Sequence, residues 1–229
     1  MDTILSKIYA LGGNITILLG RRPDQMEKDV LNSTLYSTLL SQKLKHDDES
    51  RWLNHVNLLG NLSWTFTERS TSRQQFIKTT LPHLIDTLDE NFLSGPEQQA
   101  VREAFHQLQQ LPADAPGLAA AINRLNQNTR RVSTGSRTTE ATTIELSILR
   151  QDNLMLTLQI IFESIANIDP DIFCSTLISA TNEKNNNFRY LTCYFSGNKY
   201  DESRQEIIKK LGSKLKTELV HIQDSASEN

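Results

Sequence analysis

The chain has 229 residues, of which 38% are hydrophobic and 22% are charged. This composition is typical of a globular protein that buries a core, and it excludes a fibre or a low-complexity chain. The 24 basic and 27 acidic side chains give a formal net charge of -3, so no overall positive field attracts nucleic acid. We therefore expect no nucleic-acid partner.

The beginning of the sequence does not read as a secretory signal peptide. The apolar run Ile15–Leu19 is short and ends at Gly20, and no stretch approaches the roughly 20 apolar residues that cross a bilayer. We expect synthesis in the cytoplasm. Two cysteines, Cys174 and Cys193, do not imply a disulfide framework in that compartment.

Helices are predicted for most of the first two thirds of the chain. After Pro23, apolar residues recur at steps of three and four as far as Leu44, which is the spacing of one buried helix face. A second helix, capped by Ser50, leads into a strand at Trp64–Glu68, where aromatic and β-branched residues alternate with others. Three more helices are predicted to begin at Pro82, after Pro96 and at Leu118.

From Thr142 onward the spacing of apolar residues changes to two, which is typical of strands. Two such runs flank a turn at 151–153 and predict a β-hairpin with one apolar face. A strand is predicted at Phe188–Phe195, and a final helix at Tyr200–Leu211 is predicted to end at Gly212. The segment 171–180 is compatible with either a helix or a strand.

These elements predict an α+β fold with a helical N-terminal two thirds, an antiparallel β-hairpin or sheet, and a C-terminal helix packed on that sheet. We expect one compact domain over residues 1–229. Within it, residues 1–127 are helix-rich, 128–140 form a polar connector, 141–222 are strand-rich, and 223–229 form a disordered tail. The polar segment 126–139 is compatible with an exposed connector or a long hairpin arm.

The familiar motifs of catalysis are missing from the sequence. It contains no nucleophile elbow, phosphate-binding loop or dinucleotide fingerprint. The five histidines stand alone, without the paired spacing of a zinc site, so we expect no metal. Paired acids such as Asp89-Glu90 lie beside turns, where a solvated or capping role is favoured. We predict no catalytic residues.

Core packing is the favoured role for both cysteines. Cys193 shares a strand face with Leu191 and Phe195, and Cys174 directly follows Phe173. Free cysteine is among the most buried residue types. A cysteine–histidine nucleophile is the alternative, because either thiol can meet a histidine in the folded chain.

Three segments, in their order along the chain, resemble the Evf family of bacterial virulence factors. The first is a tryptophan-containing helix that leads into a Trp strand, Trp52–Phe66. After further helices and a hairpin come Phe188–Leu191 and the closing Tyr-x-x-x-Arg-x-x-Ile-x-x-Lys-Leu-Gly helix, Tyr200–Gly212. The resemblance covers residues 26–222. It implies intertwined helices and antiparallel strands, no established enzymatic activity, a role in persistence or toxicity in an animal host, and a fatty acyl chain such as palmitate held covalently on a cysteine.

On this resemblance, Cys193 and Cys174 are the candidate lipid-attachment sites. A thioester-linked chain is favourable only where it is buried, because each buried methylene contributes about 0.8 kcal/mol. The candidate acyl pocket therefore consists of apolar residues on the hairpin face and beside Cys193, namely Leu154, Leu156, Leu158, Ile160, Leu191 and Phe195.

We therefore expect a non-enzymatic, virulence-factor-like or toxin-like bacterial protein that acts on or in an animal host and binds a fatty acyl chain or carries it covalently on a buried cysteine. Its expected partners are a fatty acid or a membrane surface and an unidentified host protein, with no cofactor besides the acyl chain, and it is released or delivered to the host. Two alternatives stay open. One is a cysteine-dependent hydrolase or acyltransferase, and the other is a protein-interaction adaptor that uses the polar arm at 126–139.

Overall fold

The computed structural model describes residues 4–43, 48–68, 77–88, 90–127, 129–134, 137–163, 168–179 and 188–222. Eight strands form the main sheet: β1 (Ser6–Leu11), β2 (Asn14–Leu19), β3 (Trp64–Glu68), β5 (Arg130–Thr134), β6 (Arg137–Leu149), β7 (Leu154–Glu163), β9 (Phe188–Phe195) and β10 (Leu219–Ile222). Two further strands, β4 (Lys78–Thr79) and β8 (Leu177–Ile178), pair with each other.

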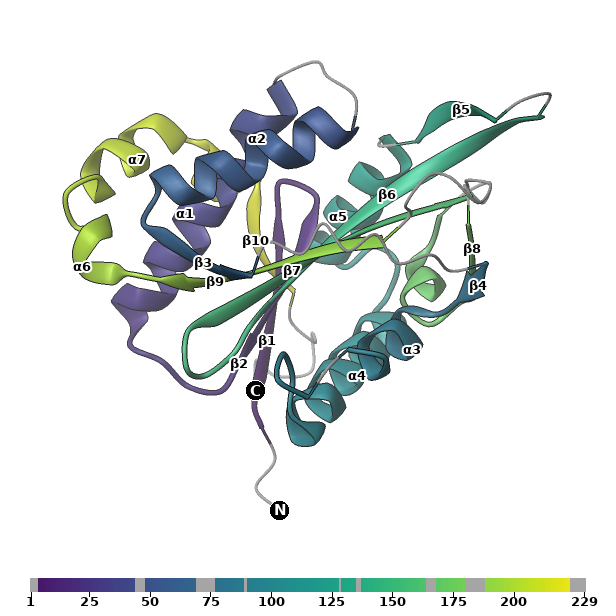
Figure 1. Cartoon of the computed structure of the whole chain (residues 1–229), viewed down its shortest axis with the longest axis horizontal. Coiled ribbons are helices and arrows are strands. Elements are labelled where there is room, and N and C mark those ends of the chain that lie inside the picture. Colours follow the sequence, from purple (N-terminus) through teal and green to yellow (C-terminus); the bar gives the residue numbers. More distant parts are fainter. Residues whose placement is uncertain are drawn as a thin grey trace.

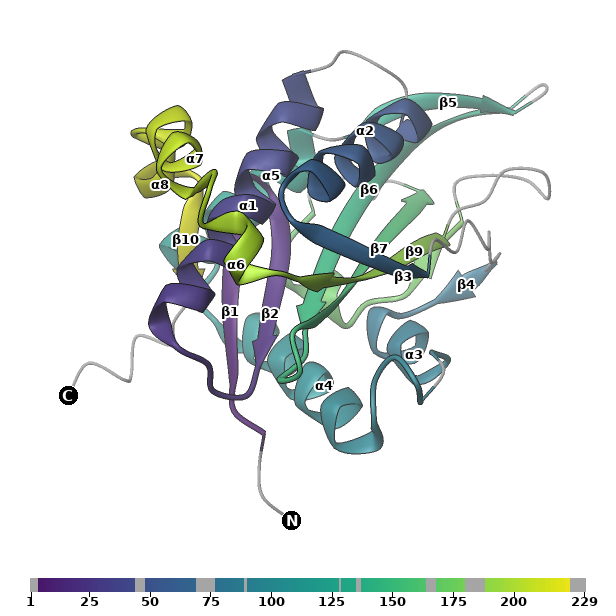
Figure 2. The same ribbon diagram turned by 60° about the vertical axis from the view of Figure 1, so that its left-hand side comes forward.

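The main sheet is mixed. Its strands follow the order β10-β1-β2-β6-β7-β9-β3, and β5 pairs with β6 outside this path. Neighbouring strands run antiparallel except β2 and β6, which run parallel and join residues far apart in sequence, such as Ile15 and Leu146. The arm of β5 and the start of β6 extends beyond the helices (Figure 2).

Helices cover both faces of this sheet (Figure 1). On one face lie α1 (Asp24–Lys43), α2 (Asp48–Asn61), α6 (Gly197–Tyr200) and α7 (Arg204–Leu211). On the other face lie α3 (Leu81–Asp86), α4 (Gly95–Gln110), α5 (Pro116–Gln127) and the short 3₁₀ helix η1 (Pro170–Phe173). A last single turn, α8 (Lys214–Thr217), precedes β10.

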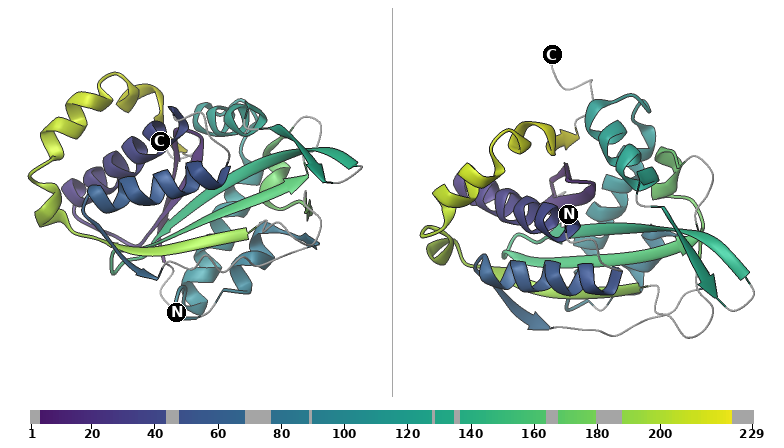
Figure 3. Two further views of the ribbon diagram at one scale, coloured as in Figure 1. Left: turned by 45° about the horizontal axis from the view of Figure 1, so that its top comes forward. Right: turned by 90° about the horizontal axis from the view of Figure 1, so that it is seen from above.

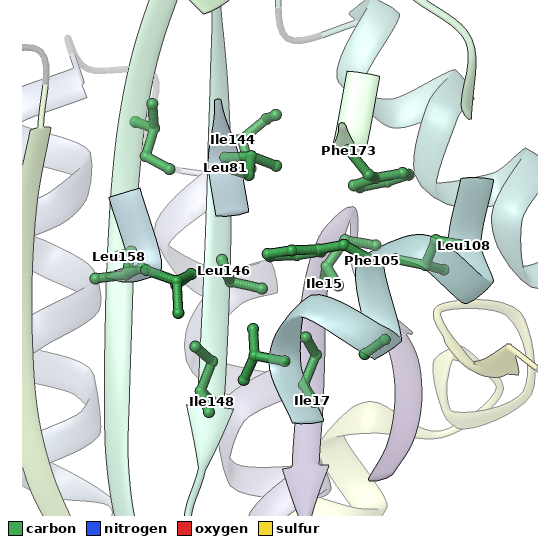
Figure 4. Close-up of a cluster of buried hydrophobic side chains, with 14 of the residues drawn as sticks. Ile15, Ile17, Leu81, Phe105, Leu108, Ile144, Leu146, Ile148, Leu158 and Phe173 are labelled. Atoms are coloured by element: carbon green, nitrogen blue, oxygen red, sulfur yellow. The ribbon is translucent and has the colours of Figure 1, made fainter. Parts of the chain in front are cut away.

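The face under α3, α4 and α5 is an apolar core, and we call it the dry face. Alternate residues of β2, β6 and β7 meet side chains of the helices there, with Phe105 of α4 near the centre (Figure 4). The strand residues labelled in that view are Ile15, Ile17, Ile144, Leu146, Ile148 and Leu158.

The predicted α+β fold class, with its helical N-terminal two thirds, antiparallel β-hairpin or sheet and C-terminal helix packed on it, is wrong, because strands of a mixed sheet make up much of the core. Strands β1 and β2 lie within the region expected to be helix-rich, and they form a hairpin that contributes two strands to the mixed sheet. Their connecting residues, Gly12 and Gly13, have φ angles of 57° and 99°. A two-residue hairpin loop needs such positive φ angles, which glycine adopts without strain.

Several predicted elements are confirmed. The hairpin after Thr142 is β6 and β7, with Ile144 opposite Ile160, and the strand at Phe188–Phe195 is β9. Before that hairpin, in the segment predicted at 126–139 as an exposed connector or a hairpin arm, β5 pairs with the start of β6. Helix α1 follows the predicted range, and Gly212 ends α7 with a φ angle of 52°.

Other boundaries differ from the predictions. Helix α2 begins at Asp48, not at Ser50, and α3 ends at Asp86, well before the expected break at Ser94. The ambiguous segment 171–180 contains both a 3₁₀ turn and a short strand, β8. The predicted tail 223–229 lies outside the described residues.

Candidate functional site

The two candidate lipid-attachment cysteines are associated with opposite faces of the sheet. Cys193 lies on β9, is 0% exposed, and packs with Leu191 and Phe195 in the apolar cluster under α1 and α2. Cys174 directly follows η1, is partly exposed, and packs against the edge of the dry-face cluster. The two sulfurs therefore have separate surroundings.

The predicted acyl-pocket residues are divided in the same way. Leu156, Leu158 and Ile160 belong to the dry-face cluster, which Cys174 borders. Leu191 and Phe195 accompany Cys193 on the other face, and Leu154 is buried near the hairpin turn outside both clusters. The six residues do not surround one sulfur.

Neither cysteine has the surroundings of a reactive nucleophile. Both are free thiols, and burial raises the pKa of Cys193. Partial burial and, to a smaller extent, the nearby Asp171 carboxylate raise the pKa of Cys174. Reactive cysteines need a lowered pKa, because the thiolate is the nucleophile. Among the described side chains, no histidine hydrogen-bonds either sulfur.

The face under α1 and α2 carries a feature that the sequence pattern did not predict. The prediction gave the hairpin one apolar face, yet its polar face is buried as well. On that face, strand pairing places polar side chains next to one another across β2, β6 and β7. We call these six residues the polar strip: Asn14, Thr16, Glu145, Ser147, Thr157 and Gln159.

Glu145 is the acidic member of the polar strip, and two amides hold it. The Asn14 side-chain amide donates to Glu145 Oε2 at 2.7 Å, and the Gln159 amide donates to Glu145 Oε1 at 2.9 Å. One pleat further, the hydroxyls of Ser147 and Thr157 lie 3.1 Å apart. Each carboxylate oxygen therefore already accepts a hydrogen bond from a buried amide.

Helix α1 covers this face with hydroxyl groups as well as apolar ones. Ser37 and Ser41 are buried, and each donates its hydroxyl to a carbonyl oxygen of the same helix at 2.8 Å. The hydroxyl of Thr38 accepts from the Asn14 amide at 3.2 Å. The hydroxyls of Thr34 and Thr16 are buried and have no hydrogen-bond partner among the described residues.

His55 of α2 completes this layer. It is 1% exposed, and neither ring nitrogen meets a described residue with hydrogen-bond geometry. Burial lowers the pKa of His55, and the Glu145 carboxylate and the Ser37 backbone oppose that effect. Because buried polar groups are nearly always hydrogen-bonded, an unpartnered imidazole here needs an explanation.

An aromatic side chain and a cation lie beside His55. The ring of Trp52 is centred 6.5 Å from that of His55, and the Arg189 guanidinium lies 5.7 Å from the centre of the Trp52 ring. Arg189 stands opposite Gln159 in the pairing of β7 with β9. The polar layer thus runs from Asn14 on β2 to Arg189 on β9.

One sequence signal was available for this layer. In α1, serine and threonine recur at steps of three and four beside the apolar residues, at positions 33, 34, 37, 38 and 41. A second stripe of small residues beside an apolar one is what a helix buried on more than one side shows. A lone histidine such as His55 carries no such signal.

Comparisons with known proteins add no relative. No protein-family model matches the chain, and neither curated proteins nor solved structures give a significant match. The resemblance to the Evf family therefore stays a prediction. None of the helices in the described part of the chain has the length and apolar character to cross a membrane. The described residues hold no group of three or more His, Cys, Asp or Glu side chains arranged for a metal ion.

Proposed function

We propose that the protein is a non-enzymatic, virulence-factor-like protein that carries a fatty acyl chain as a thioester on Cys174. The position of this cysteine carries the proposal. Its side chain is partly exposed, so an acyl donor can reach the sulfur in the folded chain. It also borders the apolar cluster that contains Leu156, Leu158 and Ile160.

Apolar surface for the chain lies nearby. Cys174 is separated from β8 by two residues, and β8 pairs with β4. Two isoleucines at this ribbon are exposed to water: Ile178 of β8 is 50% exposed, and Ile77, which directly precedes β4, is 86% exposed. An acyl chain that covers such surface gains about 0.8 kcal/mol for each methylene that it removes from water.

The attachment chemistry is a transfer between thioesters. The Cys174 sulfur bonds to the acyl carbonyl carbon of an activated donor, the donor's carbon–sulfur bond breaks, and the proton of the Cys174 thiol ends on the departing thiol. Because the pKa of Cys174 is raised, its thiolate is scarce at neutral pH. We therefore assign the transfer to a separate acyltransferase and leave the carrier without a catalytic role.

The geometry weighs against the alternative of a cysteine-dependent hydrolase. His55 lies near Glu145 and Trp52, at the end of β9 that carries Arg189. Cys193 is four residues beyond Arg189 on β9, which is about 13 Å along a strand. A nucleophile and its base must lie within hydrogen-bond reach.

The resemblance to the Evf family supports the remaining parts of the proposal. They are synthesis in the cytoplasm, release or delivery to an animal host, and persistence or toxicity there. The acyl chain would give the protein its affinity for a membrane surface, and a single chain gives only reversible binding.

Intact-mass spectrometry of protein purified from its native source tests the acylation. We expect the mass of one added acyl chain, removed by neutral hydroxylamine, which cleaves thioesters. The added mass should disappear in Cys174→Ser and persist in Cys193→Ser, the matched control. Loss in Cys193→Ser alone would move the site to the buried sulfur, and an unmodified wild-type mass would refute the acyl carrier.

The hairpin arm favours a second candidate function, a protein-interaction adaptor. Strand β5 pairs with β6 and with no other described strand, so one backbone edge is open to another chain. Figure 1 shows the arm extending away from the helices. A pull-down with the full chain and with a chain lacking 131–139 tests this candidate, and identical partners for the two would refute it.

A further inference from the structure

Helix α2 lies at the periphery, and one of its sides closes the polar-strip face of the sheet. It runs over β9 in the view from above in Figure 3. Its inner side buries Trp52, Val56 and Leu59 in the same apolar cluster as Cys193, whereas Leu53 on its outer side is 49% exposed. Moving α2 away from the sheet would therefore uncover that cluster.

His55 lies on this inner side, and few charges face it. Among the described residues, Glu145 approaches from β6, and Arg189 of β9 lies over the neighbouring Trp52. Helix α1 and strand β7 present hydroxyl and amide groups instead, and Arg51 is the charged neighbour on α2 itself.

A proton on His55 would place a cation in a closed layer. The available counterion is Glu145, whose two oxygens already accept from Asn14 and Gln159. Both nitrogens of a protonated imidazole are donors, and among the described residues neither has an acceptor with good hydrogen-bond geometry, although the Ser37 backbone lies near enough to favour the proton. Water offers those acceptors once α2 moves away, so the open state binds the proton more tightly than the closed state.

We infer that His55 is an acid-sensitive latch: its protonation below about pH 6.5 releases α2 from the sheet and uncovers the apolar cluster that contains Cys193. This inference does not depend on acylation of Cys174.

The direction of the pH response follows from the difference in the pKa of His55 between the closed and the open state. In the closed state the pKa of His55 is lowered, mainly by burial, and in an open, hydrated state it returns to about 6.5. Above that pH neither state binds the proton, and the latch stays closed. Below it, the ratio of open to closed molecules rises by up to about tenfold per pH unit until the closed state also binds the proton.

Thiol labelling of the full chain tests the latch, after hydroxylamine has removed any acyl chain. A pyridyl disulfide reacts with thiols in neutral and mildly acidic solution, and mass spectrometry separates the peptides of the two cysteines. Cys174 is partly exposed and serves as the internal reference. We expect the rate at Cys193, relative to Cys174, to rise by up to about tenfold between about pH 6.5 and 5.5, with unchanged far-UV circular dichroism.

Four variants connect the response to the proposed groups. His55→Gln should show no rise, whereas His83→Gln and His106→Gln, which alter exposed histidines, should keep it. Glu145→Gln removes the counterion of the closed state and lowers the pKa of His55 in that state further, so the rise should continue to a lower pH than in the wild type. If His55→Gln does not fold, this extension and the wild-type profile decide.

A flat wild-type profile would overturn the latch. An equal rise in His55→Gln, or a loss of secondary structure at the same pH as the rise, would overturn it as well. An equal rise in His55→Gln would place the titrating group elsewhere, and a loss of secondary structure would show global unfolding.

Discussion

The two faces of the central sheet are both buried, but they are built from different side chains. On the dry face, β2, β6 and β7 present isoleucine and leucine to α3, α4 and α5. On the opposite face, the same three strands present the polar strip to α1 and α2. One face of the sheet is therefore apolar, and the other carries many hydrogen-bonding groups.

The two faces should therefore contribute differently to stability and to the response to pH. Apolar packing is favourable wherever surface is removed from water, and it does not depend on protonation. A buried polar group is tolerated only while its partners are in place. We therefore expect the dry face to hold the fold together and the polar-strip face, with its buried His55, to respond to pH.

The largest effect should come from the dry face. Phe105 is fully buried at its centre, so Phe105→Ala removes packing and leaves a cavity that costs about 3–5 kcal/mol of the free energy of unfolding. The exposed neighbour His106 provides the control, because His106→Ala should change it by less than about 0.5 kcal/mol. Urea unfolding measures both, and a small loss for Phe105→Ala would refute the assignment of the core.

A smaller effect should distinguish the polar-strip face by its pH dependence. As the pH falls below about 6.5, the wild-type free energy of unfolding should drop by at most about 1.4 kcal/mol per unit, since the unfolded chain protonates His55 first. His55→Leu should remove this contribution. Urea unfolding at several pH values compares the two chains, and parallel pH profiles would show that His55 does not titrate on unfolding.

A third effect, of similar size, concerns a satisfied pair in the polar strip. Ser147→Ala leaves the buried hydroxyl of Thr157 without its partner and should cost about 1–3 kcal/mol at most. Adding Thr157→Val removes the orphaned group, so the double variant should be more stable than that single variant. Additive losses in urea unfolding would mean that the two hydroxyls do not depend on each other.

Local patterns in the sequence were sufficient for several elements. The hairpin of β6 and β7 follows from strict alternation on both sides of a turn, and α1 follows from its helical spacing. The hairpin of β1 and β2 was missed although Gly12-Gly13 marks its turn, because its flanking runs are short and apolar on both faces.

Nonlocal contacts explain what the sequence did not indicate. The parallel pairing of β2 with β6 joins Ile15 to Leu146, and no local pattern encodes such a partner. The same limit applies to the cysteines, since the side of the sheet that each one faces depends on the whole topology. The interaction of His55 with Glu145 could not be predicted either, because the two residues are far apart in the sequence.

Hydrogen exchange on the intact chain tests most directly whether the two faces differ in this way. Peptides from α2 and from β6 and β7 are compared at about pH 7.5 and about pH 5.5, after correction for the intrinsic exchange rate at each pH. The account predicts that α2 loses protection at the lower pH while β6 and β7 keep theirs. Equal protection of α2 at both pH values, or a loss shared by all three elements, would contradict it.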